Sequence, residues 1–82
     1  MKRHIITDVT PAHAKYLAGW VYPPDDPVVA EMLEKIRTRT FLPEPPIVIG
    51  RNASGIFFSD GRHRLSAVYH SGRVCTLMFH WH

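Results

Sequence analysis

The seven prolines of the chain limit where regular secondary structure can form. Proline lacks a backbone N–H and disrupts the interior of a helix or a central strand, but it fits the first turn of a helix. Thr10-Pro11 and Asp26-Pro27 each pair a residue type that caps helices with a following proline, so each predicts a helix start. The other prolines indicate loops at 23–24 and 43–46.

A chain of 82 residues is short enough that we expect one domain spanning residues 1–82. Hydrophobic residues make up 45% of it, which is too many for a disordered chain. The single cysteine cannot form an internal disulfide. With no apolar run of about 18 residues, we expect a cytoplasmic protein without membrane association.

The first half of the chain predicts one short strand and two helices. The β-prone run 4–7 precedes a helix that begins at Pro11 and ends at Gly19. From Pro27 to about Thr38, apolar residues recur at helical spacing and charged residues occupy the other face, as in an amphipathic helix.

The second half predicts a hairpin, a helix and a last strand. The apolar runs 47–49 and 56–58 flank a turn-forming segment, as in a β-hairpin. A helix is expected over 62–71, closed by Gly72, and residues 75–82 alternate between apolar and more polar side chains. The expected fold class is therefore α/β, a small mixed sheet with about three helices.

The segment 59–65 lies where a strand leads into a helix, and it carries most of the chemical information. The first backbone N–H groups of a helix lack helical acceptors and favour anions. Arg62, His63 and Arg64 add positive charge where a helix prefers acids, and Gly61 allows a close approach to the backbone. This pattern predicts a phosphate site in which Arg64 faces the ligand more than the core. The alternative is that Asp60 only caps the helix and the basic residues form a solvated end.

At these residues the chain resembles the ParB N-terminal domain/sulfiredoxin superfamily, as a stand-alone single-domain member. The motif Asp60 to Arg64 after a hairpin, the preceding helix 26–38 and the strand 46–49 carry the likeness, which covers roughly residues 20–79. The superfamily contains CTP-hydrolysing partition proteins, ATP-using sulfinic acid reductases, free-serine kinases and reported nucleases. The resemblance implies a ParB/sulfiredoxin-like fold with a nucleotide-phosphate site at this helix start and a nucleoside triphosphate with magnesium as its cofactor.

The motif also departs from the best-known members of the superfamily. Gly61, His63 and Arg64 match the sulfiredoxin motif Gly-Cys-His-Arg, but Arg62 stands where the nucleophilic cysteine would be. Arg62 also replaces the glutamate of the partition-protein motif Gly-Glu-Arg-Arg. The closest likeness is to the Asp-Gly-His-His-Arg version, in which Asp60 would be a base or a metal ligand. Weak phosphotransfer or NTPase activity with Asp60 as its catalytic residue is left open.

Outside the motif, the resemblance indicates further ligand contacts. Lys35 lies near the point of its helix from which a polar residue approaches the nucleotide in similar proteins. Tyr22 and Trp20 are candidates for stacking on a base, with packing beneath the proline-rich loop as the alternative. The acidic pair Asp25-Asp26 would repel a triphosphate unless a divalent cation bridged them.

Several other residues favour structural interpretations. Cys75 lies on the expected core face of the last strand and should be a buried, inert thiol. Arg37 and Arg39 end a helix, where cations suit the helix dipole, and this is favoured over phosphate binding. Histidines in the last strand and the preceding helix could form a metal site, but no metal site is predicted; these are His70, His80 and His82.

Two functional hypotheses follow. The first is a phosphate- or nucleotide-binding accessory domain, with a ligand site at Asp60 to Arg64. Because the net charge is only +3, nucleic-acid binding is expected to be weak. The second is a non-enzymatic protein-interaction or inhibitor module of a phage or plasmid that uses the same basic surface. A protein partner or a homodimer is compatible with either.

Overall fold

A computed structural model describes residues 3–59 and 61–81. Within these residues the chain forms a four-stranded sheet and three helices, so the predicted α/β class is confirmed. In chain order the elements are β1 (Arg3–Val9), α1 (Pro11–Ala18), α2 (Pro27–Arg37), β2 (Ile47–Asn52), β3 (Gly55–Ser59), α3 (Arg62–Ser71) and β4 (Cys75–Trp81).

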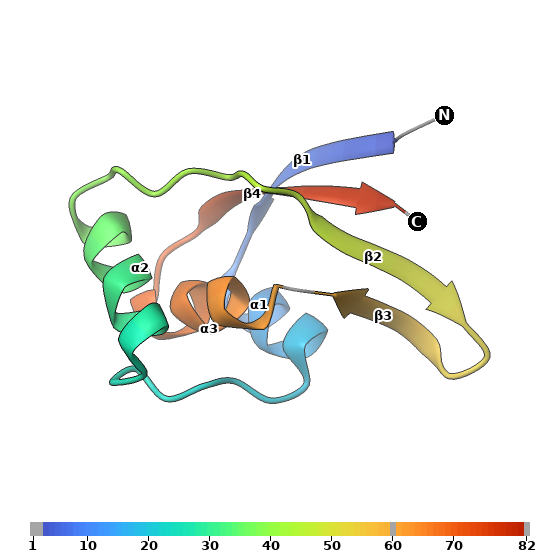
Figure 1. Ribbon diagram of the computed structural model, residues 1–82, viewed down its shortest axis with the longest axis horizontal. Coiled ribbons are helices and arrows are strands. Elements are labelled where there is room, and N and C mark those ends of the chain that lie inside the picture. The colour runs from blue at the N-terminus through green and yellow to red at the C-terminus, as the bar shows by residue number, and fades with distance from the viewer. Residues whose placement is uncertain (1–2, 60, 82) are drawn as a thin grey trace.

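The sheet is mixed, with the strand order β1-β4-β2-β3. The C-terminal strand β4 lies between the antiparallel β1 and the parallel β2, and β3 pairs with β2 as the second strand of a hairpin. The three helices lie to one side of the strands, with α3 close to both α1 and α2 (Figure 1). The start of α3 therefore lies among the sheet, α1 and the segment that leads into α2.

The helix starts form as the capping residues predict. The Thr10 hydroxyl accepts a hydrogen bond from the backbone N–H of His13 at 3.1 Å, with proline in the first turn of α1. The Asp26 carboxylate accepts bonds from Val28 N and Val29 N at 3.0 and 3.1 Å at the start of α2. Each cap satisfies backbone donors that the helix leaves without acceptors.

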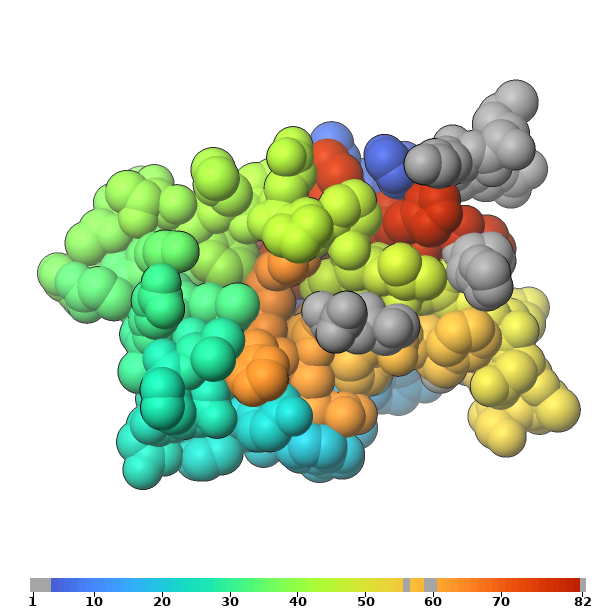
Figure 2. Space-filling model, in the orientation of Figure 1, coloured from blue at the N-terminus to red at the C-terminus, as the bar shows by residue number. Residues whose placement is uncertain are grey.

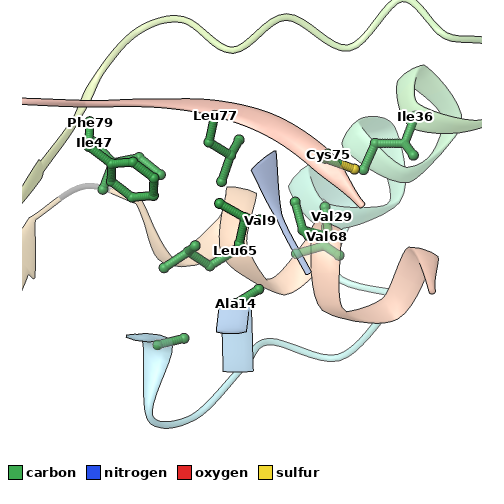
Figure 3. Close-up of a cluster of buried hydrophobic side chains, with 12 residues drawn as sticks. Val9, Ala14, Val29, Ile36, Ile47, Leu65, Val68, Cys75, Leu77 and Phe79 are labelled. Atoms are coloured by element: carbon green, nitrogen blue, oxygen red, sulfur yellow. The ribbon is translucent and has the colours of Figure 1, made fainter. Parts of the chain in front are cut away.

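The core lies between the sheet and α3, and the alternation in the last strand builds much of it. Cys75, Leu77 and Phe79 are buried on one face of β4, as predicted. They meet other fully buried residues, among them Leu65 of α3 and Ile47 of the neighbouring strand β2 (Figure 3). Burial of these apolar side chains supplies most of the free energy that holds the layers together.

The hairpin depends on a glycine beneath an aromatic ring. Gly50 and Phe57 are directly opposite each other in the β2–β3 pair. A Cβ atom on Gly50 would lie 2.7 Å from Phe57 Cζ, so the ring occupies the space above the glycine. Figure 2 shows that the β2–β3 turn projects from one end of the molecule.

None of the helices in the described chain is long and apolar enough to span a membrane.

Candidate functional site

The start of α3 has the backbone features expected of an anion site. Gly61 is the N-cap residue, with φ −125° and ψ 0°, and it supplies no side-chain hydrogen bond to the helix. The first turn of α3 contains no acidic residue. Asp60, the tentative catalytic residue, lies outside the described residues, so its role stays a prediction.

Gly61 is required by packing, whatever ligand binds nearby. A Cβ atom at this position would lie 2.5 Å from Cγ2 and 2.9 Å from Cγ1 of the fully buried Ile47. Such distances are shorter than real carbon contacts, so any larger residue would displace α3 from β2. The glycine thus seats the helix start directly against the sheet.

Arg62 is held by contacts within the protein. Its guanidinium donates a hydrogen bond to the carbonyl oxygen of Ala18 at 3.0 Å. The same group lies 3.9 Å from the centroid of the Trp20 ring and 4.9 Å from that of Phe58, which is cation–π geometry. Arg62 Nε is buried, with no hydrogen-bond acceptor in the described part of the chain.

His63 also contacts the segment before α2. Its imidazole stacks on the Tyr22 ring, with centroids 4.1 Å apart and planes 3° from parallel. Its Nε2 lies 3.8 Å from Asp26 Oδ1, and Tyr22 makes an edge contact with Trp20 at 5.0 Å. Both aromatic rings proposed for base stacking therefore pack on protein groups, the alternative that the sequence left open. Trp20 nevertheless remains 52% exposed.

Arg64 is more deeply placed than the sequence predicts. It is only 8% exposed and donates a hydrogen bond from Nη1 to the Pro45 carbonyl oxygen. Burial lowers the pKa of its guanidinium, because a charge loses hydration there. The expectation that its charge faces a ligand more than the core needs correction: Arg64 also ties the first turn of α3 to the 43–46 segment.

Two of the predicted phosphate ligands nevertheless share a pocket. Lys35 of α2 and Arg64 of α3 both line a hollow of about 240 Å³, whose other walls come from Met32 and the 40–45 segment. The Lys35 side chain is 53% exposed, and its Nζ lies 3.5 Å from Glu31 Oε1. An exposed pair of this kind is weak, so Lys35 can turn toward an anion at little cost.

A polar stripe on α3 was missed at the sequence level. Arg62, Ser66 and His70 follow one another at intervals of four residues. Arg62 bonds to the last residue of α1, and Ser66 and His70 bond to Tyr22 in the segment between α1 and α2. Ser66 Oγ accepts from Tyr22 N at 2.9 Å, and His70 Nε2 lies 2.8 Å from the Tyr22 carbonyl oxygen. The spacing of four residues between these polar side chains is the signal in the sequence that could have revealed the stripe. In the view of Figure 2, α3 is visible at the surface as a band between α2 and the β2–β3 hairpin.

The metal-ligating side chains of the described residues do not form a cluster that could hold a metal ion. Residues 3–59 and 61–81 contain no group of three or more His, Cys, Asp or Glu side chains arranged to hold one. Asp26 is occupied as the cap of α2, and the neighbouring carbonyl of Tyr22 accepts from His70.

Comparison with known proteins assigns no family. No protein-family model matches the chain, and neither a curated protein nor a solved structure matches it significantly.

Proposed function

We propose that this protein binds a small phosphate-bearing ligand, and that the phosphate lies in the pocket between Lys35 and Arg64, beside the start of α3. The observation that carries the proposal is that these two cationic side chains, from different helices, line one pocket. The likeness to the ParB/sulfiredoxin superfamily supports a nucleotide as the ligand.

The site offers three kinds of attraction for a phosphate. Arg64 presents a guanidinium whose position is already restrained by Pro45, so little side-chain entropy is lost when it binds. Lys35 adds a mobile ammonium at the rim. The first turn of α3 contains no acid and lies at the positive end of the helix dipole, so it favours an anion, whereas Glu44 in the pocket wall opposes one.

The pocket suits the phosphates rather than a whole nucleotide. Its volume of about 240 Å³ is below the 300 to 1,000 Å³ typical of sites that enclose a complete small ligand. The sugar and base would then lie outside the pocket. Trp20, which is half-exposed beside Arg62, is the candidate for stacking on the base, and it does not itself line the phosphate pocket.

The second candidate is a protein-interaction module, and the Trp20–Arg62 contact favours it. Exposed Trp and Arg side chains are over-represented among the residues that dominate protein–protein binding energy. Trp20 is half-exposed here and held in place by the Arg62 guanidinium. A partner with an acidic surface would be the natural complement to a chain with a net charge of +3.

The test is a calorimetric titration of the purified protein with pyrophosphate and with nucleoside triphosphates, each with and without magnesium. Lys35→Gln should weaken binding about tenfold or more, because it removes a charge-assisted contact of about 1.5 to 3 kcal/mol. Arg51→Gln, at an exposed position away from the pocket, is the matched control and should change nothing. Absence of binding, or equal affinity in Lys35→Gln, would contradict the proposal.

A salt series with duplex DNA separates nucleotide from nucleic acid. Few cationic side chains surround the site, so we expect the protein to contact only about two to four DNA phosphates. The logarithm of the DNA affinity plotted against the logarithm of the salt concentration should then have a slope of about −2 to −4. Non-specific DNA binding near physiological salt should then be no tighter than tens of micromolar. Submicromolar DNA binding with a slope steeper than about −5 would identify nucleic acid as the ligand instead.

A further inference from the structure

A second hollow lies away from the α3 start, where α2 ends and β4 begins. Its volume is about 430 Å³, which falls within the range of small-molecule sites. Its apolar walls come from Ile36 of α2, Phe41 and Pro43 of the following segment, and Val74 just before β4. Cys75 projects toward Ile36 in this region (Figure 3).

Two arginines, Arg39 and Arg73, complete the walls of this hollow. Both are exposed, and neither forms an ion pair with any described acidic residue. Arg37, by contrast, lies in a neighbouring hollow and is paired with Glu34. The cavity therefore combines an apolar interior with two uncompensated guanidinium groups.

The backbone at Arg39 adds an independent observation. Arg39 has φ 60°, the left-handed conformation that glycine usually occupies just after a helix. Here it follows the C-cap Thr38, and Thr40 N bonds back to Lys35 O at 2.8 Å, which closes the end of α2. A glycine would satisfy this turn with less strain, so an arginine at this position sacrifices stability and keeps a cation at the cavity.

We propose that the cavity formed by Ile36, Phe41, Pro43 and Val74 with Arg39 and Arg73 is a binding site for a small amphipathic carboxylate. The carboxylate would bind the guanidinium groups, whose planar forks match its geometry. The apolar tail would cover the hydrophobic walls and the Val74 side chain, which is 59% exposed. A smaller hollow shares Ile36 and Arg73 and extends the groove between α2 and α3.

Octanoate is a suitable probe, with octan-1-ol and acetate as controls for the head group and the tail. Calorimetry with the full chain should show octanoate binding at least tenfold tighter than either control.

Arg39→Gly separates binding from folding. The substitution relieves the left-handed backbone and removes the cation, so the melting temperature should rise while octanoate affinity falls at least tenfold. Arg73→Gln should also lose affinity tenfold, with no gain in melting temperature. Lys35→Gln alters only the phosphate pocket and should bind octanoate like the wild type, so the two sites are tested separately.

Several outcomes would overturn the proposal. Equal affinity for octanoate and octan-1-ol would show that the arginines do not recognise the carboxylate. Unchanged octanoate binding in Arg39→Gly or Arg73→Gln would place any binding elsewhere. No octanoate binding at millimolar concentration would remove the site altogether.

Discussion

Arg64→Ala should destabilise the fold substantially, because this side chain acts as a structural tie as well as a candidate ligand. In the folded protein Arg64 is 8% exposed and its guanidinium donates to the Pro45 carbonyl oxygen. The substitution removes a charge-assisted hydrogen bond of about 1.5 to 3 kcal/mol. It also removes a buried aliphatic stem, in which each methylene contributes about 0.8 kcal/mol.

Removing the buried charge of Arg64 also brings a gain, which reduces the total loss of stability in Arg64→Ala. Burial lowers the pKa of Arg64 because its charge is partly desolvated, and alanine avoids that cost. The net loss should be about 2 to 3 kcal/mol, or a fall in Tm of about 10 to 20 °C for a domain of this size. Arg64→Met keeps most of the apolar volume and should lose about half as much.

Urea unfolding followed by tryptophan fluorescence measures these differences. Arg51→Ala is the control, because an exposed arginine should change the free energy of unfolding by no more than about 0.5 kcal/mol. An Arg64→Ala protein as stable as this control, with an unchanged m-value, would refute the argument. Arg64 would then not join α3 to the 43–46 segment in solution.

Three further predictions concern the packing around α3 and the buried thiol of Cys75. Gly61→Ala should lower the free energy of unfolding by about 1 to 3 kcal/mol, because the added Cβ atom would clash with Ile47. Ile47→Ala should relieve part of this clash, so a double-mutant cycle should show favourable coupling between the two substitutions. Additive losses would contradict the close approach of Gly61 to Ile47. Ser66→Ala should cost about 1 to 3 kcal/mol in urea unfolding, because it leaves the backbone N–H of Tyr22 without its acceptor, and an unchanged urea midpoint would argue against that bond. Burial raises the pKa of the Cys75 thiol in the folded protein. The contribution of the protonated thiol to the free energy of unfolding should therefore be complete below the unfolded-state pKa of about 8.5, and it should be lost as pH rises through the higher folded-state pKa. Cys75→Ala should therefore flatten the alkaline limb of the stability–pH curve, and an alkaline limb identical to that of the wild type would exclude Cys75 as its cause.

The elements that could be predicted from the sequence are those with local signals. Asp26 before a proline marks the start of α2, and the alternation of Cys75, Leu77 and Phe79 marks the core face of β4. These signals span a few residues, and the folded protein uses them as short-range chemistry predicts. The α/β class follows from the presence of such helices and strands along the chain.

The contacts that the sequence could not predict join distant segments. The Ser66–Tyr22 hydrogen bond and the Arg62–Ala18 hydrogen bond each span 44 residues. The placement of Arg64 depends on the path of the 43–46 segment, which local propensity does not determine. A basic triplet at a helix start indicates an anion site in isolation, but tertiary packing decides which charges reach it.

The most direct measurement of phosphate binding is an ¹⁵N–¹H correlation spectrum of the labelled protein titrated with pyrophosphate. Binding between Lys35 and Arg64 should shift the backbone amide signals of residues 62–64 and of Lys35 together, with one shared affinity. The spectrum of Lys35→Gln should move much less at the same concentrations. Shifts confined to other parts of the molecule, such as the region around Arg39 and Arg73, or no shifts at all, would contradict a phosphate site at the start of α3.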